Sequence, residues 1–447
     1  MLGIVYLPTP APGAPDPARE RVAGLTPLRR LVLTLQVAGC TRLLVVSRAP
    51  LDELAAALRG IAGVELVPGA QAELARLLVD TELSSQPILL ADGRICLSRN
   101  IPSGLAQAAG EGSAVALDDQ EAASGIAWMR AAASAALAQH LQAAPGRALA
   151  EAFRELIERG LAIPCRSAFP EFAALVVDRA GLSIATRKLF RSIYKPTDNL
   201  YARLNRRLSL PLTRLLLPTA TTANLMTLLT LGVGVAAGLL MARGDYFGLA
   251  LGAFLSYLAA VLDGCDGEIA RLKFEESALG CWLDSVADYA YYFFFYGGLV
   301  IGLYRQTHAP WVLLAGASTI SGLVAGQAIT AWQRRRYSGS NPGGFAAMVQ
   351  EQLDKRSDQD RSAFILKWVN QYAKRSTMPF WSFVVILLGG AKFLLWLSAI
   401  CAWWYVLGAL FVRRFYPKSG SVAQARPLPP ALPEAAPGAT SRRPVAP

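Results

Sequence analysis

Short apolar runs alternate with amphipathic stretches through the first 190 residues. The apolar runs have the length and β-branched content of strands, and the stretches between them repeat apolar residues with helical spacing. The predicted strands are LGIVYL (2–7), RLLVVS (42–47), VELV (64–67), PILLAD (87–92), SAVALD (113–118) and AALVVD (173–178), and the predicted helices cover residues 26–39, 50–60 and 71–80. Because strands that alternate with helices build a mostly parallel sheet, we predict a soluble α/β domain over residues 1–190.

After residue 220 the alternation gives way to long apolar runs with few charges. A hydrocarbon core of about 30 Å requires roughly 20 apolar residues of helix, a length that several of these runs reach. The last run, residues 379–412, is too long for one span, and we divide it near Gly389–Lys392. We therefore predict an all-α domain of six transmembrane helices over residues 223–415. Its spans are expected at residues 224–242, 246–262, 281–304 and 310–332 and in the two halves of 379–412.

The segment between these domains, residues 191–222, mixes leucine with arginine. In DNLYARLNRRLSLPLTRLLL (198–217) this pattern suits a juxtamembrane helix that lies in the anionic membrane interface, and a charged linker is the alternative. The tail, residues 416–447, is rich in proline and alanine, so we predict that it is disordered.

Lysine and arginine are distributed unequally between the two sides of the predicted membrane domain. The connection between the fourth and fifth spans carries nine basic residues, whereas the opposite side carries Arg243, Arg305 and Lys392. By the positive-inside rule, the α/β domain, the turn at 264–280, the loop at 333–378 and the C-terminus are cytoplasmic. We therefore expect a multi-pass protein of the cell inner membrane.

The composition narrows the classes of function. The chain has 447 residues, of which 53% are hydrophobic, and a formal net charge of +12. Phospholipid headgroups, nucleotides and phosphorylated metabolites are therefore favoured as partners. Six scattered cysteines without a C-x-x-C pair argue against a disulfide framework or a structural zinc site. Two histidines leave little room for imidazole catalysis.

Four aspartates interrupt the apolar sequence near the second and third predicted spans: Asp263, Asp266, Asp284 and Asp288. A charge at the bilayer centre costs about 2.5–3.5 kcal/mol even on insertion scales, so acids kept there point to a function. The first two are three residues apart and the last two are four apart, so each pair lies on one face of its helix. A short turn makes the two helices antiparallel neighbours, and both pairs can then face one another.

Four neighbouring carboxylates repel one another unless cations neutralise them. Oxygen ligands of this kind suit Mg²⁺, Mn²⁺ or Ca²⁺ and not zinc, so we predict a site for a pair of divalent ions. Small residues and an arginine accompany the acids, namely Gly264, Gly267, Ala270, Gly280 and Arg271. Because small residues admit a bulky ligand and a guanidinium binds phosphate oxygens, these features predict a diphosphate nucleotide. The alternative is a small-residue helix contact beside a solvated acidic cluster.

These residues fit the pattern D-x2-D-G-x2-A-R-x8-G-x3-D-x3-D without a gap. The pattern resembles the signature of the CDP-alcohol phosphotransferases, also called CDP-alcohol phosphatidyltransferases, and the resemblance extends over about residues 195–415. Enzymes of this family transfer a substituted phosphoryl group from a CDP-linked donor to an alcohol and release CMP, as in phospholipid or di-inositol-phosphate synthesis. One departure is Thr222-Ala223-Asn224, where many relatives have Thr-Pro-Asn at the start of the first span.

The resemblance implies a role for each matching residue. The metal ligands would be Asp263, Asp266, Asp284 and Asp288, and the residues bordering the cytidine diphosphate would be Gly267, Ala270, Arg271 and Gly280. Asp288 is in addition the expected general base for the acceptor hydroxyl. The resemblance further implies two Mg²⁺ or Mn²⁺ ions, a CDP-linked donor, a polar alcohol acceptor, contact with membrane lipid, no nucleic-acid partner and a homodimer.

The junction between the two predicted domains is similar to that of the bifunctional inositol-phosphate cytidylyltransferase/di-inositol-phosphate-phosphate synthases. The resemblance rests on Lys195-Pro196-Thr197-Asp198, Asn205-Arg206 and Ser209, and GLTPLRRLVLTLQVAGCTRLLVVS resembles part of their cytosolic nucleotidyltransferase domain. Asp92 and Asp178 lie where that superfamily carries metal-binding acids, although a role as strand-end turn residues fits equally well. The first strand leads into a proline-rich loop without the G-x-G-x-R phosphate-binding pattern, so we predict a degenerate nucleotidyltransferase-like domain.

Two other classes of function fit parts of the sequence. The acids could line the cation pathway of a transporter, although they cluster at one end of the helices. The protein could instead be a membrane-anchored nucleotide-binding module, although its phosphate-binding loop is missing while the membrane motif is complete. The acceptor also stays open, because basic residues near the membrane suit both a phosphorylated alcohol, such as inositol phosphate or glycerol phosphate, and anionic lipid headgroups. Those residues are Arg191, Lys195, Lys273 and Arg334–Arg336.

Overall fold

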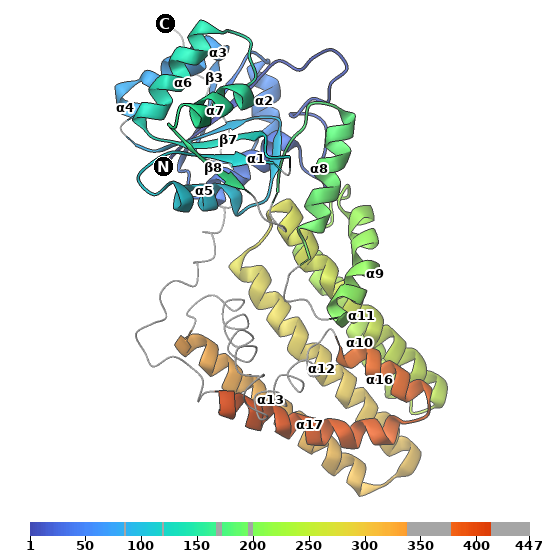
Figure 1. The fold of residues 1–447 in the computed structure, drawn as a ribbon. Helices are drawn as coiled ribbons and strands as arrows, with labels where there is room; N and C mark the ends of the chain where they lie inside the picture. Colours follow the sequence, from blue (N-terminus) through green and yellow to red (C-terminus); the bar gives the residue numbers. More distant parts are fainter. Residues whose placement is uncertain (85, 119, 167–171, 195–199, 338–376, 413–447) are drawn as a thin grey trace, which may run out of the picture. The chain divides into compact units, whose positions relative to one another are not determined.

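The computed structural model describes residues 1–84, 86–118, 120–166, 172–194, 200–337 and 377–412 (Figure 1). These residues form two compact units, one within Met1–Lys195 and one within Pro196–Pro430. Three predicted features lie outside the described residues: the tail at 416–447, the part of the basic loop at 338–376 and the Lys195–Asp198 junction.

The N-terminal unit is built on a seven-stranded sheet with the strand order β3-β2-β1-β4-β7-β6-β8 (Figure 1). Its strands are β1 (Leu2–Leu7), β2 (Arg42–Ser47), β3 (Val64–Pro68), β4 (Ile88–Asp92), β6 (Ala114–Leu117), β7 (Ala123–Met129) and β8 (Ile163–Arg166). Neighbouring strands are parallel except at β7, which is antiparallel to both β4 and β6. The prediction of a mostly parallel sheet is therefore confirmed.

Three strands of the N-terminal unit were not predicted from the sequence pattern. β7 contains Gly125 and small residues, and β8 contains Pro164, so both have low β-propensity. Pro164 is tolerated because β8 is an edge strand. The third, β5 (Ile95–Leu97), pairs with β9 (Ala173–Leu175) in a separate two-stranded sheet. The strand predicted at 173–178 is thus shorter than expected and lies outside the main sheet.

Helices cover both faces of the seven-stranded sheet. α1 (Pro27–Val37), α2 (Leu51–Ala57) and α5 (Ile101–Ala109) pack on one face, and α3 (Gln71–Val79), α6 (Ala131–Ala143) and α7 (Leu149–Glu158) pack on the other. Side chains of the central strand β1 point alternately to the two faces of the sheet. Val5 and Leu7 pack in the core beneath α1, α2 and α5, and Leu2 and Ile4 pack in the core beneath α3, α6 and α7. The unit also contains α4 (Thr81–Ser84) and α8 (Arg179–Arg191).

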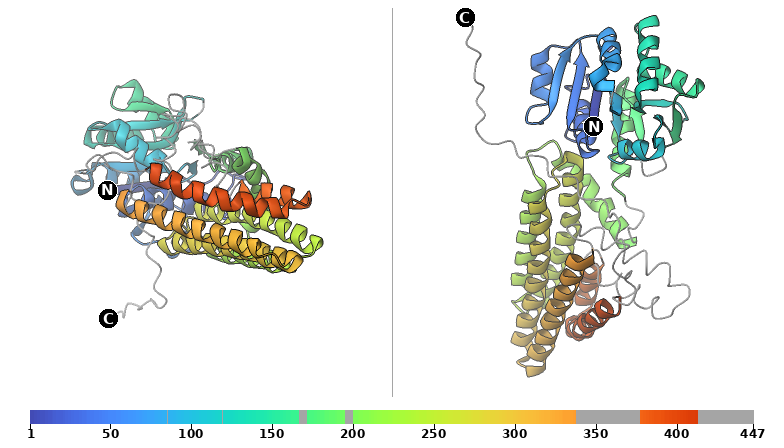
Figure 2. Two further views of the ribbon diagram at one scale, coloured as in Figure 1. Left: turned by 90° about the horizontal axis from the view of Figure 1, so that it is seen from below. Right: turned by 90° about the vertical axis from the view of Figure 1, so that its left-hand side faces the viewer.

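The second unit consists of the helices α9 (Leu200–Leu216), α10 (Ala223–Met241), α11 (Tyr246–Lys273), α12 (Ala278–Thr307), α13 (Pro310–Tyr337), α16 (Met378–Leu387) and α17 (Ala391–Val412). Of these, α10, α11 and α12 run side by side in both views of Figure 2. Among the described residues, five helices are long and apolar enough to cross a membrane, namely α10, α11, α12, α13 and α17. The chain is thus a membrane protein by the length and composition of its helices.

The predicted division of the last apolar run near Gly389–Lys392 is confirmed, because α16 ends at Leu387 and α17 begins at Ala391. Five of the six predicted spans are helices of spanning length among the described residues. α16 has 10 residues, about 15 Å of helix, which is half of a hydrocarbon core of about 30 Å. Of the two spans predicted there, only the second reaches spanning length in the part of the chain that the structure describes.

α9 buries polar residues and exposes leucines. Asn205, Ser209 and Thr213 recur every four residues and are buried, whereas Leu204 and Leu208 are exposed. This is the inverse of a surface helix on a soluble protein, and it suits a helix whose outer face meets lipid. The predicted helix is confirmed over Leu200–Leu216, and its position in the membrane interface stays a prediction.

α10 packs along both α11 and α12, which contact each other over a much shorter length. Glycines allow the close approach: a Cβ at Gly298 of α12 would collide with the carbonyl oxygen of Gly238 in α10, and a Cβ at Gly252 of α11 would collide with Met241. Such small-residue contacts let helix backbones touch. The expectation that α11 and α12 are antiparallel neighbours therefore holds only near their connection, because α10 fills the space between them.

Candidate active site

A four-residue connection joins α11 to α12. α11 ends at Lys273, where Phe274 adopts a left-handed backbone conformation with φ of 60°. α12 begins after Ser277, whose hydroxyl oxygen accepts the Gly280 N–H at 3.0 Å and caps the helix. Because the connection is short, residues at equal distances from it come close together. The acidic residues of both helices lie roughly two to three turns from it.

Three of the four predicted metal ligands converge. One carboxylate oxygen each from Asp263, Asp284 and Asp288 lie within 4.8 Å of one another, and all three residues are partly buried. Among the residues that the structure describes, this is the one group of three or more His, Cys, Asp or Glu side chains close enough to share a metal ion. An all-oxygen donor set fits Mg²⁺ or Mn²⁺ and does not fit metals that prefer thiolate or imidazole.

Asp266 lies beside this cluster and is oriented by a different helix. Its carboxylate is buried, accepts a 2.7 Å hydrogen bond from the Thr227 hydroxyl of α10 and also accepts the Gly267 N–H. Asp263 precedes Asp266 by three residues on α11, so the two side chains lie on the same face of that helix. The sequence pattern does not single out Thr227, although its place one turn after Asn224 in the first span is a usable signal.

The residues expected to border a nucleotide lie at the same end of α11 and α12 as the acids. A Cβ at Gly267 would meet the Arg271 guanidinium at 3.6 Å, so Arg271 lies along the face that this glycine leaves open. A Cβ at Gly280 would lie 3.0 Å from the side-chain oxygen of Asn224, so Gly280 lets α10 approach the start of α12. Ala270 packs against the small apolar cluster at the start of α10.

The connection between α11 and α12 also holds the start of α10. The Glu275 carboxylate accepts the Ala223 N–H at 2.8 Å, and Lys273 Nζ donates to the carbonyl oxygens of Thr219 and Thr221 at 3.0 and 2.8 Å. A proline at position 223 has no N–H to donate. The departure from Thr-Pro-Asn therefore adds a contact between α10 and the connection.

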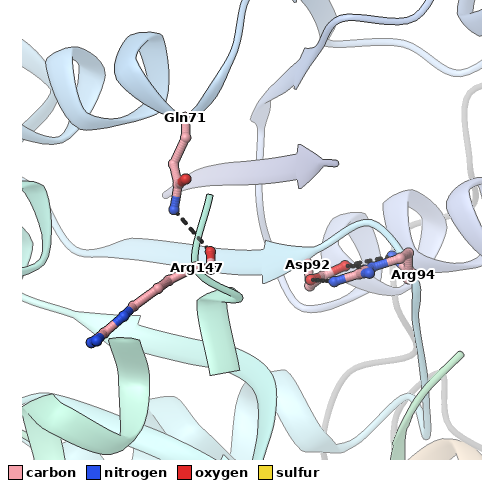
Figure 3. A network of polar contacts seen from close by, with 4 residues as sticks. All are labelled: Gln71, Asp92, Arg94 and Arg147. Atoms are coloured by element: carbon pink, nitrogen blue, oxygen red, sulfur yellow. Dashed lines mark hydrogen bonds and ion pairs between the residues drawn. The ribbon is translucent and has the colours of Figure 1, made fainter. Parts of the chain in front are cut away.

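In the N-terminal unit, Asp92 is engaged by a neighbouring arginine (Figure 3). Its side chain is 2% exposed and accepts Arg94 Nε at 3.0 Å and Arg94 Nη2 at 2.8 Å. The Asp92 hydrogen bond raises the pKa of Arg94. Figure 3 also shows a separate contact in which Gln71 Nε2 donates to the Arg147 carbonyl at 3.0 Å and ties the α6–α7 loop to α3. Asp92 thus has the structural role of a residue in the turn between β4 and β5.

Asp178 also has a structural role. It is the N-cap of α8, and its carboxylate accepts the Gly181 N–H at 2.6 Å. The loop after β1 is fixed from inside by Arg30 of α1, whose guanidinium is buried and donates to the carbonyl oxygens of Val22 and Ala23 at 2.9 and 3.2 Å. Of the two interpretations of Asp92 and Asp178, the contacts favour turn and cap residues.

Comparison with known proteins yields a family for the helical unit. Residues 220–411 match the model of the CDP-alcohol phosphatidyltransferase family. The chain is 30% identical over 146 residues to a "Bifunctional IPC transferase and DIPP synthase" from Aquifex aeolicus, which is 32% of this chain and 31% of that protein. It is 38% identical over 106 residues to the protein of the same name from Thermococcus kodakarensis, which is 23% of each chain. The chain thus matches less than a third of the length of these relatives.

A solved structure is similar to the N-terminal part. It is a 4-diphosphocytidyl-2C-methyl-D-erythritol synthase from Anaerococcus prevotii, with 13% identity and a TM-score of 0.32 over 42% of this chain and 97% of that one. At these values the likeness carries no argument about the N-terminal unit. The family match of the helical unit is better supported. The matched residues include the whole D-x2-D-G-x2-A-R-x8-G-x3-D-x3-D pattern and the three converging aspartates. Over residues 220–411, the helical unit thus matches the CDP-alcohol phosphatidyltransferase family.

Proposed function

We propose that this protein transfers a substituted phosphoryl group from a CDP-alcohol donor to an acceptor alcohol and releases CMP. The observation that carries the proposal is the convergence of Asp263, Asp284 and Asp288 from two helices within 4.8 Å. This cluster lies inside the domain that matches the CDP-alcohol phosphatidyltransferase family.

In this proposal, Asp263, Asp284 and Asp288 hold divalent cations, with Asp266 as the fourth ligand. The donor set favours two Mg²⁺ or Mn²⁺ ions. When bound, such ions would offset the negative charge of the donor diphosphate and of the departing CMP.

The chain's own residues bind the donor and move the proton. Arg271 binds diphosphate oxygens, and Gly267, Ala270 and Gly280 leave room for the cytidine diphosphate. Asp288 accepts the proton of the acceptor hydroxyl while the oxygen of that hydroxyl forms a bond to the distal phosphorus of the donor. The bridging P–O bond of the diphosphate breaks, and its electron pair leaves with CMP.

We further propose that the acceptor is a phosphorylated alcohol of the inositol phosphate or glycerol phosphate type. The name DIPP synthase of the relatives supports an inositol-based acceptor, and the net charge of +12 supports an anionic one. The N-terminal unit does not make the donor in this proposal, because its candidate acids Asp92 and Asp178 serve as ion-pair and cap residues.

The proposed setting is the cell inner membrane, with the N-terminal unit and the C-terminus in the cytoplasm and two chains in a homodimer. The unequal distribution of basic residues supports this orientation. The exposed leucine face of α9 supports contact with membrane lipid. The homodimer rests on the family resemblance alone.

Two other functions are less well supported. A cation pathway would need polar groups across the whole membrane, whereas the converging acids lie at one end of α11 and α12. A binding module would not need the complete acidic pattern beside the nucleotide-bordering residues.

The test is CMP release by the full chain in proteoliposomes with Mg²⁺. CDP-diacylglycerol and CDP-inositol serve as donors, each paired with inositol phosphate or glycerol phosphate. We expect one pair to release CMP in proportion to product, and Asp263→Asn to abolish that release. Release of CMP from none of the pairs, by protein that is folded and inserted, would refute the proposed reaction for these substrates.

A further inference from the structure

A buried carboxylate outside the acidic pattern links α9 to the active-site helix. Glu268 of α11 lies two residues after Asp266 and is 0% exposed. Its two oxygens accept hydrogen bonds from two hydroxyl groups of α9, Ser209 and Thr213, each at 2.7 Å. A buried carboxylate is tolerated only where such partners replace water. The polar face that α9 turns inward is therefore matched to this side chain.

Two guanidinium groups lie near the same carboxylate. Arg206 of α9 has its Nη1 atom 3.5 Å from a Glu268 oxygen, and its side chain is 13% exposed. Arg271 of the acidic pattern follows Glu268 by three residues on α11, so the two side chains lie on the same face of that helix. Glu268 thus pairs with an arginine of α9 and shares a helix face with an arginine of α11.

We infer that Glu268 is a positioning residue that holds Arg206 and Arg271 where they bind the phosphate groups of the CDP-linked donor. This inference rests on the proposed function. A tie between helices alone would not need a charge, because a glutamine side chain can exchange hydrogen bonds with both hydroxyl groups. The negative charge is needed only to orient the guanidinium groups.

Two effects of removing this charge have opposite signs. Loss of a carboxylate makes the local potential more positive, which would tighten the binding of an anionic nucleotide. Loss of the orienting partner lets the guanidinium groups move away, which would weaken binding. The direction of the change therefore separates positioning from simple charge.

The experiment is a calorimetric titration of the detergent-solubilised full chain with CDP in the presence of Mg²⁺. Glu268→Gln should weaken CDP binding by about tenfold, the scale typical of partners that orient binding groups, while the melting temperature changes little. Asp245→Asn is the matched control at the other end of the same helix, about 35 Å away. Asp245 caps α11 by accepting the Gly248 N–H, and asparagine caps equally well, so binding should not change.

A second variant, Arg206→Gln, keeps the inference falsifiable if Glu268→Gln does not fold. It should also weaken CDP binding, and the double variant should lose less than the sum of the two single losses, because Glu268→Gln cannot misplace Arg206 once Arg206 is absent. Unchanged or tighter binding in Glu268→Gln, or additive losses, would overturn the inference. If Glu268→Gln is unfolded, wild-type binding in Arg206→Gln would overturn it. Failure of the wild-type chain to bind CDP would instead count against the proposed function, and the inference would fall with it.

Discussion

The hydroxyl of Thr227 on α10 donates a 2.7 Å hydrogen bond to the carboxylate of Asp266 on α11. Both side chains are buried, and the other three acids of the pattern converge on one another instead. The four aspartates are therefore not equivalent: one is oriented by a third helix, and three form the cluster.

Thr227→Val should weaken CDP binding about tenfold, because it keeps the shape of the side chain but removes the hydroxyl that orients Asp266. Calorimetric titration with CDP and Mg²⁺ measures the change. Thr230→Val is the matched control on the same helix: Thr230 is buried, and its hydroxyl oxygen has no hydrogen-bond partner among the described residues. A similar loss in both variants would show that packing of α10, and not the hydrogen bond, is responsible.

Asp288→Asn should lower turnover by about 10²–10⁴-fold, the usual range for a general base. CDP binding should weaken far less, because the remaining acids still offer carboxylate ligands. Asp266→Asn should instead loosen metal and nucleotide together. Initial rates and CDP titrations of both variants test this difference. Near-normal turnover of Asp288→Asn would exclude this residue from proton transfer. Equal losses of CDP binding in Asp288→Asn and Asp266→Asn would show that Asp288 is only a metal ligand.

Chelation with EDTA should abolish CMP release, and Mg²⁺ or Mn²⁺ should restore it, because clustered carboxylates repel one another and the donor diphosphate without cations. The measurement is the initial rate before chelation, after it and after titration of each ion. Zn²⁺ should restore the rate poorly, because an all-oxygen site does not suit it. Full activity after exhaustive chelation would contradict a metal site at this cluster.

Glu275→Ala should lower the free energy of unfolding by about 1 kcal/mol, because it removes the acceptor of the Ala223 N–H. In the Ala223→Pro background, Glu275→Ala should lower the free energy of unfolding by roughly half as much or less. Proline has no N–H to bond to Glu275, and it is favoured at the first position of a helix. Thermal unfolding in detergent of the four proteins of this cycle gives the coupling. Equal costs in both backgrounds would mean that the contact contributes nothing to stability.

The full chain should release no pyrophosphate from CTP and inositol phosphate, because Asp92 pairs with Arg94 and Asp178 caps α8. A coupled pyrophosphate assay measures this, and CMP release by the same preparation serves as its control. Pyrophosphate above the blank would show that the N-terminal unit is an active nucleotidyltransferase.

The periodicity of apolar residues by itself determined much of the architecture. The alternating runs at 2–7 and 42–47 became β1 and β2, because a strand buried on both faces must be apolar throughout. Most of the long runs after residue 220 became helices long and apolar enough to cross a membrane, because a bilayer requires length and apolarity before any other property. The spacing of the aspartates likewise placed each pair on one face of its helix.

Only the tertiary structure decided how those elements meet. β7 carries small residues and takes its conformation from its neighbours β4 and β6, so local propensity did not predict it. The insertion of α10 between α11 and α12 depends on glycine contacts that no periodicity reveals. Glu268 had no distinguishing pattern along the chain. Its role follows from two hydroxyl groups more than 50 residues earlier in the sequence, because a buried charge is defined by its partners in space and not by its neighbours in sequence.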